Sequence, residues 1–172
     1  MPAAEEISEI VIRENIARAV ADVFKTMLGR PVSLDTSVDE KKIETHLAAN
    51  GVPQVVGTVG FIGEANGLVY LYMDETFASQ CTGQILGMTD FELQAAGDDV
   101  VNDAIGELTN MVVGSFKNAL CDAGYPCKLT IPSILRGRNF RIESTSTAQR
   151  RSYRFACGDH RVVADIILKP TD

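Results

Sequence analysis

The chain has 172 residues, a length that fits one domain or at most two small ones. Apolar residues make up 45% of the chain and charged residues 23%, a composition that excludes collagen-like and disordered proteins. With 16 Lys and Arg against 23 Asp and Glu, the formal net charge is −7. This balance argues against nucleic-acid binding, because neutralising phosphates requires a basic surface.

Targeting and metal-binding signals are missing from the sequence. No stretch approaches the roughly 20 apolar residues that span a bilayer, and the acidic N-terminal sequence is unlike a signal peptide. The four cysteines form no C-x-x-C pair, and two isolated histidines do not suggest a metal cluster. We therefore expect a cytoplasmic protein with reduced thiols and with neither a membrane nor a nucleic-acid partner.

Charge is distributed unevenly along the chain. Residues 1–135 carry 8 basic and 19 acidic groups, whereas residues 136–172 carry 8 basic and 4 acidic groups, including seven arginines from Arg136 to Arg161. Such an asymmetry can mark a binding face. The simpler interpretation is the solvated side of antiparallel strands.

The first third of the chain begins with a predicted amphipathic helix. Apolar residues recur at helical spacing from about residue 5 to 28, and the main positions are Ile12, Ile16, Val20, Val23 and Met27. Gly29 and Pro31 predict its end. A short strand is expected at 31–38. The polar stretch 39–50 gives no clear expectation.

A hairpin and a second helix are expected next. Residues 55–62 and 68–73 read as strands, and Asn66-Gly67 between them is typical of a type I′ turn. Glycines at 57, 60 and 63 do not fit a phosphate loop, so they indicate close approach of neighbouring elements. Asp74 is suited to cap a helix that runs to about Leu86 and ends at Gly87.

The remainder predicts one long helix followed by strands. The helix covers about 97–122, with Asp98 or Asp99 as its cap and Gly124 after its end. Four strands are expected, at 128–135, 139–147, 152–157 and 161–168. Three of them are consecutive and closely linked, which predicts an antiparallel meander. The order indicates a single α+β domain over residues 1–172, with a mixed or antiparallel sheet and long helices packed on one side.

The long helix carries an unusual polar ridge. Five residues follow one another at steps of four, three, four and three: Asp103, Glu107, Asn110, Gly114 and Lys117. Glu107 and Asn110 lie away from the apolar stripe, so both are expected to be exposed. Gly114 costs up to about 1 kcal/mol relative to Ala in a helix interior. Taken alone, this pattern also fits a solvated face with one unfavourable glycine.

These residues resemble a known signature. Asp103-x-x-x-Glu107-x-x-Asn110, followed by Gly114 and Pro132, resembles that of the CheC/CheX/FliY family of chemotaxis phosphatases. The surrounding segments 63–71, 106–114 and 129–137 are also similar to family segments, and the resemblance runs from about residue 55 to the C-terminus. Residues 13–16 lack a second Glu-x-x-Asn step, which points to a CheX-type member.

The resemblance implies a fold, a reaction and a partner. The fold would be the CheC/CheX α+β domain, and the reaction hydrolysis of the phospho-aspartate of a CheY-like response regulator. Asn110 would orient the attacking water, and Glu107 would hold the regulator's active-site lysine. Asp103, Gly114 and Lys117 would contact the partner. Mg²⁺ is expected on the regulator, with no cofactor bound by this chain, and CheX-like proteins are expected to be homodimers.

Three other functions remain open. The chain could be a non-catalytic module that binds a response regulator, or a flagellar-switch or receptor-array scaffold with the same fold. A stand-alone small-molecule enzyme is the third alternative, although no nucleophile triad or phosphate loop is present in the sequence.

Overall fold

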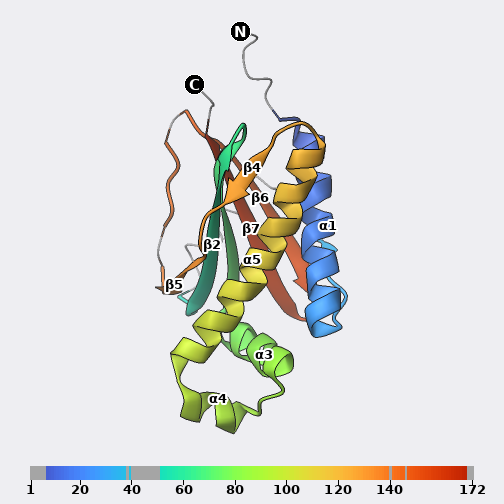
Figure 1. Cartoon of the computed structure of the whole chain (residues 1–172). Helices are drawn as coiled ribbons and strands as arrows, with labels where there is room; N and C mark the ends of the chain where they lie inside the picture. The colour runs from blue at the N-terminus through green and yellow to red at the C-terminus, as the bar shows by residue number, and fades with distance from the viewer. Residues whose placement is uncertain (1–6, 38, 40–50, 140, 146, 170–172) are drawn as a thin grey trace.

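An antiparallel sheet carries the long helices on one of its faces (Figure 1). The computed structural model describes residues 7–37, 39, 51–139, 141–145 and 147–169. Within them the strands are β1 (Ser33–Leu34), β2 (Gln54–Gly63), β3 (Asn66–Asp74), β4 (Cys127–Leu129), β5 (Ser133–Gly137), β6 (Gln149–Cys157) and β7 (His160–Lys169). The helices are α1 (Glu9–Leu28), α3 (Glu75–Leu86), α4 (Asp90–Ala96) and α5 (Asp98–Asp122). The predicted α+β class is confirmed.

Strand order fixes where each edge of the sheet lies. It runs β1-β6-β7-β3-β2-β4, and β5 also pairs with β2, beyond the end of β4. All pairs among the described strands are antiparallel. In this order β6 is separated from β5 by β7, β3 and β2, so the predicted meander of consecutive strands is wrong. Among the described strands that follow α5, only β6 and β7 form a hairpin.

The N-terminal helix begins later than predicted. Its first residue is Glu9, because the Ser8 side chain accepts a hydrogen bond from the Val11 N–H at 3.2 Å and caps the helix. Its end agrees with the prediction, since Gly29 adopts a left-handed φ of 62°. The expected strand at 31–38 is reduced to the two residues of β1. Residues 38 and 40–50 lie outside the described part of the chain.

The predicted position of the turn in the first hairpin, at Asn66-Gly67, is wrong. Residues 64 and 65 make the turn, whereas Asn66 and Gly67 belong to β3, with Gly67 opposite Phe61. The Asn66 side chain instead accepts a hydrogen bond from the Gly63 N–H at 3.0 Å. A Cβ on Gly67 would overlap the backbone carbonyl oxygen of Ile167 in β7 and would lie 2.7 Å from the Phe61 ring. Glycine is needed here for close packing, not for a left-handed turn.

The α3 prediction is confirmed at both ends, and a further helix follows it. The Asp74 side chain accepts from the Phe77 N–H at 2.6 Å, and Gly87 adopts a φ of 66° after Leu86. Helix α4 was not predicted from the sequence. Its signal is a capping box in which Thr89 and Glu92 bond each other's backbone N–H.

Helix α5 agrees closely with the predicted range, but its cap does not. Gly97 occupies the cap position without a side-chain hydrogen bond, and Asp98 and Asp99 lie inside the first turn. Their negative carboxylates stabilise the helix there, because they lie near the positive end of its dipole. Gly124, with a φ of 97°, follows the end of the helix as predicted.

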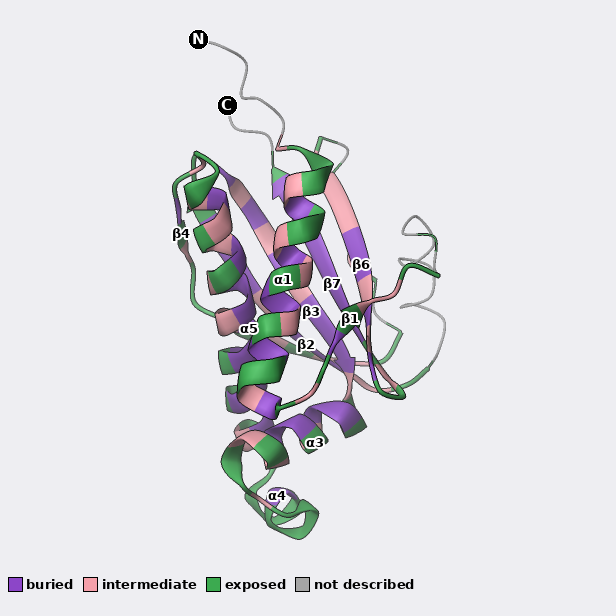
Figure 2. Ribbon diagram, turned by 90° about the vertical axis from the view of Figure 1, so that its right-hand side faces the viewer, coloured by how far each residue is buried: buried purple, intermediate pink, exposed green. Residues whose placement is uncertain are grey.

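The main core lies between the sheet and the helices (Figure 2). Alternate residues of β2, β3, β6 and β7 point into it, and helices α1, α3 and α5 cover them. Phe61 of β2 meets Phe116 of α5 edge to face, with ring centroids 6.2 Å apart. This packing fixes α5 firmly on the sheet, next to the edge formed by β4 and β5.

The opposite face of the sheet is covered in part by the chain that connects β5 to β6. Ile142 packs there against Val56, Tyr72 and Val163. The predicted strand at 139–147 is wrong, because the described residues in that range contain no strand. Since β5 and β6 lie far apart in the strand order, this connection has to cross the sheet, and its described residues do not pair with any strand.

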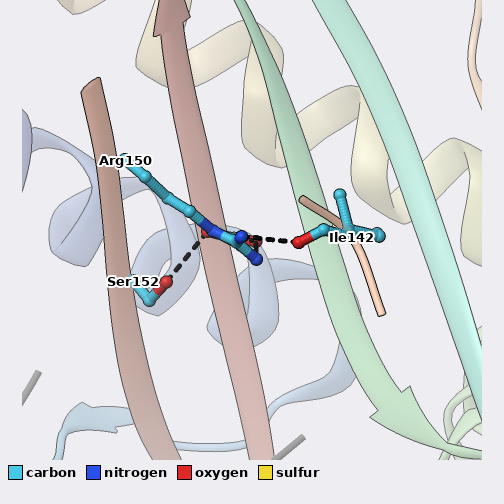
Figure 3. A network of polar contacts seen from close by, with 4 residues as sticks. Ile142, Arg150 and Ser152 are labelled. Atoms are coloured by element: carbon cyan, nitrogen blue, oxygen red, sulfur yellow. Dashed lines mark hydrogen bonds and ion pairs between the residues drawn. The ribbon is translucent and has the colours of Figure 1, made fainter. Parts of the chain in front are cut away.

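An ion pair beneath this connection involves the arginine-rich region (Figure 3). Arg150 Nη2 lies 2.6 Å from the carboxylate of Asp165, which is fully buried, and Ser152 donates to the same carboxylate at 2.9 Å. Arg150 Nη1 also donates to the carbonyl of Ile142 at 2.6 Å. Arg154 pairs with Asp35 at 2.8 Å. These two arginines hold strands and connections together and are therefore not part of an open basic surface.

Candidate functional site

The five predicted ridge residues remain on one side of α5, with unequal exposure. Asp103 and Glu107 are exposed, whereas Asn110, Gly114 and Lys117 are partly buried. The expectation of full exposure is therefore confirmed for Glu107 and wrong for Asn110. A carboxylate and an amide one helical turn apart thus lie at the boundary between solvent and the adjoining sheet edge.

Asn110 is partly buried because its side of α5 runs along β4 and β5. A Cβ on Gly106 would lie 4.0 Å from Pro132 Cβ, and one on Gly114 would lie 3.6 Å from Leu129 Cδ1. Gly106, Asn110 and Gly114 are spaced by four residues and so share one line along the helix. Asn110, in the middle of this line, therefore lies opposite the connection between Leu129 and Pro132. Gly114 thus faces Leu129 of β4 and is not open to solvent along its whole surface.

That connection is a β-bulge. Leu129 pairs with Phe61 and Ser133 with Thr58, so the three residues 130–132 oppose the two residues 59 and 60. Pro132, which has no N–H to donate, fits such a break at a sheet edge. The Ile131 side chain projects into solvent and is 85% exposed. Pro132 in the middle of the predicted strand 128–135 was the signal for this break.

The N-terminal half of α5 is also fastened to β5. Arg136 Nε donates to the side-chain oxygen of Asn102, and Arg136 Nη1 lies 3.8 Å from the Asp98 carboxylate. Asn102 immediately precedes Asp103. Arg136, one of the seven clustered arginines, therefore helps to place the first turns of the ridge.

The ridge supplies a specific and limited chemistry. The Glu107 carboxylate can accept a charge-assisted hydrogen bond from a cation, and the Asn110 amide has both a donor and an acceptor for a water molecule. The neighbouring hydroxyl of Thr109 is buried and donates to the Ile105 carbonyl at 2.7 Å, so it is not presented as a nucleophile. This arrangement suits a site completed by a second molecule that brings its own reactive group.

Other parts of the described chain add little to this site. Among the described residues, no group of three or more His, Cys, Asp or Glu side chains is placed to hold a metal ion. In that same part of the chain, no helix is long and apolar enough to cross a bilayer. A cleft of about 630 Å³ lies between α3, α4 and the start of α5, lined in part by Glu75, Asp90 and Arg138. Neither Glu107 nor Asn110 lines that cleft.

Comparison with known proteins decides the family. A family model described as "Chemotaxis phosphatase CheX" matches residues 55–156, which is more than half of the chain. The chain belongs to the CheX chemotaxis phosphatase family. The matched range extends from β2 into β6, so it contains the whole ridge and the bulge. The resemblance read from the Asp-x-x-x-Glu-x-x-Asn pattern is thereby confirmed.

One curated relative and several solved structures agree with the CheX family. The "CheY-P phosphatase CheX" of Thermotoga maritima is 31% identical over 91 residues, and this match spans 52% of the present chain and 56% of that relative. The chain thus matches little more than half of the relative's length. The chemotaxis protein CheX from Vibrio vulnificus has a TM-score of 0.74 at 22% identity, covering 92% of this chain and 99% of that one. A complex of CheX with CheY, BeF₃ and Mg²⁺ from Borrelia burgdorferi has a TM-score of 0.70 at 19% identity, covering 95% of this chain and 99% of that one. These two structures share the CheX fold with this chain.

Proposed function

We propose that this protein hydrolyses the phospho-aspartate of a CheY-like response regulator. The observation that carries the proposal is the pairing of exposed Glu107 with partly buried Asn110, one turn apart on α5, inside the range matched by the CheX family model. The T. maritima relative is a CheY-P phosphatase, and the B. burgdorferi structure is a CheX complex with CheY. Both support a phosphorylated regulator as the substrate.

In this mechanism Asn110 positions the attacking water. An acyl phosphate is already activated, so hydrolysis requires an oriented water for in-line attack more than a new nucleophile on the enzyme. The Asn110 amide can accept a hydrogen bond from the water and donate one to the phosphoryl group or to the water itself. Since the edge of β4 and β5 limits the space around Asn110, the amide has fewer orientations available than on an open helix face.

Glu107 has a different role, which is to hold the partner. Its exposed carboxylate would accept a hydrogen bond from the regulator's active-site lysine and so align the phosphoryl group with Asn110. Asp103, Gly114 and Lys117 would contribute contacts on the same ridge. Mg²⁺ would be bound by the regulator, in keeping with the Mg²⁺ in the B. burgdorferi complex. The chain itself would supply the Glu107 and Asn110 groups.

The assembly and the cellular setting of the protein are further parts of the proposal. Residues 1–172 would act as one domain, in the cytoplasm, and as a homodimer, since a chain with one ridge would gain a second site by pairing. Light scattering at micromolar concentration is expected to give twice the chain mass of 18.6 kDa. A monomeric mass would contradict the dimer without affecting the assignment of the ridge.

The experiment that tests the reaction is phosphate release from purified regulators. Each response regulator of the source organism is phosphorylated and its dephosphorylation is followed with and without this protein. One regulator is expected to lose phosphate markedly faster in its presence. Binding without acceleration would favour a non-catalytic regulator-binding module, which would use the same ridge. Absence of both binding and acceleration with every regulator would overturn the proposed function.

A further inference from the structure

The β-bulge beside the ridge presents one apolar side chain to solvent. Ile131 is 85% exposed, more than any other large apolar side chain that the structure describes. Single exposed apolar residues are common on protein surfaces and do not by themselves indicate a site. Ile131 differs from the others, Ile10 of α1 for example, in how it is held and in what lies next to it.

Ile131 is held by fixed neighbours on both sides. The Thr130 N–H donates to the Gly60 carbonyl at 2.8 Å, and the Gly60 N–H donates to the Thr130 hydroxyl at 2.9 Å, so Thr130 is fastened to β2 twice. On the other side Pro132 restricts the backbone through its ring, and Ser133 resumes pairing with β2. A side chain mounted in this way loses little backbone freedom when a partner covers it.

Ile131 also lies next to the proposed catalytic amide. Pro132 is adjacent to Gly106, and Leu129 is adjacent to Gly114, and Asn110 is midway between these two glycines on α5. The bulge therefore projects beside Asn110. A protein surface that brings a phospho-aspartate to Asn110 therefore comes close to the bulge that carries Ile131.

We propose that Ile131 is a docking contact for the phosphorylated response regulator. This inference rests on the proposed function and adds a residue outside the five of the ridge. The side chain would pack against an apolar part of the regulator next to its phospho-aspartate, removing apolar area from water and limiting access of bulk water to the site. Glu107 would then provide charge recognition, and Ile131 an uncharged contact that salt does not screen.

The test compares Ile131→Ser with the control Ile10→Ser, whose side chain is 68% exposed on α1. Affinity is measured by titration against the regulator in its BeF₃-bound form, and steady-state phosphate release gives kcat and KM. We expect Ile131→Ser to raise Kd and KM about ten-fold or more, as for loss of a well-buried aliphatic contact, with kcat within about two-fold of wild type. Ile131→Leu, which keeps an aliphatic side chain of similar size, is expected to retain the wild-type Kd. Ile10→Ser is expected to leave Kd unchanged.

The outcomes separate this inference from the proposed function. Unchanged Kd and KM for Ile131→Ser, with normal hydrolysis by the wild type, would overturn the docking contact alone. If the wild type binds a regulator without hydrolysing its phosphate, the phosphatase assignment fails and the titration still decides the role of Ile131. If the wild type binds no regulator, both are overturned. Because Ile131 points into solvent, thermal unfolding of Ile131→Ser is expected to match that of the wild type.

Discussion

Thr109 of α5 lies directly over Gly57 of β2, so closely that a Cβ on Gly57 would overlap the Thr109 hydroxyl and lie 2.8 Å from its Cβ. The buried Thr109 hydroxyl is already committed to the Ile105 carbonyl. The missing side chain at position 57 therefore sets how near the helix can approach the sheet. Since Asn110 follows Thr109 directly, the same contact determines the height of the proposed catalytic amide above the sheet.

Gly57→Ala is expected to destabilise the protein by about 1–3 kcal/mol, as overpacking of a tight core contact does. The free energy of unfolding is measured in urea. Gly114→Ala provides the control, because its Cβ would have an ordinary 3.6 Å contact with Leu129 and Ala favours the helix. Equal stability of Gly57→Ala and wild type would show that the contact between α5 and β2 is not tight.

Asn110→Ala is expected to lower kcat for phosphate release about 100-fold or more while leaving affinity for the regulator nearly unchanged. The physical reason is that alanine cannot orient the attacking water. Single-turnover dephosphorylation and titration against the BeF₃-bound regulator measure the two quantities. Asn118→Ala, an exposed asparagine further along α5, serves as the control and should retain the wild-type rate. Wild-type hydrolysis by Asn110→Ala would disprove the role of the amide.

Glu107→Gln is expected to weaken binding of the regulator by roughly 10- to 100-fold, because a hydrogen bond to a charged group contributes about 1.5–3 kcal/mol. Hydrolysis at subsaturating regulator should fall by a similar factor. Isothermal titration gives the affinity. Glu14→Gln, an exposed carboxylate on α1, is the matched control. An unchanged affinity for Glu107→Gln would remove this carboxylate from the docking surface.

Asp165→Asn is expected to lower the free energy of unfolding by about 3–5 kcal/mol, because it removes the buried carboxylate that pairs with the Arg150 guanidinium, which is only 12% exposed. The control is Glu143→Gln, whose partner Arg141 lies 3.2 Å away with both side chains 70% exposed. Such an exposed pair contributes at most about 1 kcal/mol. Similar unfolding curves for the two variants would show that the ion pair under the β5–β6 connection has no structural role.

The stability contribution of Asp35 is expected to be lost in acid. Hydrogen bonds from Ser37 and from Arg154 lower the pKa of the Asp35 carboxyl from 3.8 to about 2. A carboxyl whose pKa is lower in the folded state stabilises the fold above its unfolded pKa, and this contribution disappears as the pH falls from about 4 to 2. The difference in unfolding free energy between wild type and Asp35→Asn should shrink over that range. An NMR titration of Asp35 with a midpoint near 4 would contradict this expectation.

Features set by local sequence were predicted well. In helix α5, apolar residues recur at helical spacing over a long segment with clear end signals. Its range and its ridge could therefore be predicted directly. The Asp74 cap and Gly87 define α3 in the same way. Asn66-Gly67 misled the prediction because a dipeptide typical of turns can equally be selected for packing, here of Gly67 against Phe61.

Features set by contacts distant in sequence could not be predicted in this way. Nothing in residues 133–137 indicates that they pair with β2 and not with β6, so the meander was wrong. The partial burial of Asn110 has the same origin, since the helix period describes α5 alone and the covering edge comes from residues 129–134. The bulge itself had a local signal in Pro132, but the side chain that it exposes becomes meaningful only beside α5.

The proposed hydrolytic residues lie on α5, whereas the proposed docking residue lies on the bulge. This separation has a consequence for how such a protein can evolve. Asn110 lies between Thr109 and Met111, one of them fully buried and the other packed against the core, so a change that shifts this helix disturbs folding and chemistry together. Ile131 points into water, so its replacement is expected to leave the helix in place. Under the proposed function, we expect preference for one regulator over another to change by single substitutions at the sheet edge, while Glu107 and Asn110 on α5 stay the same.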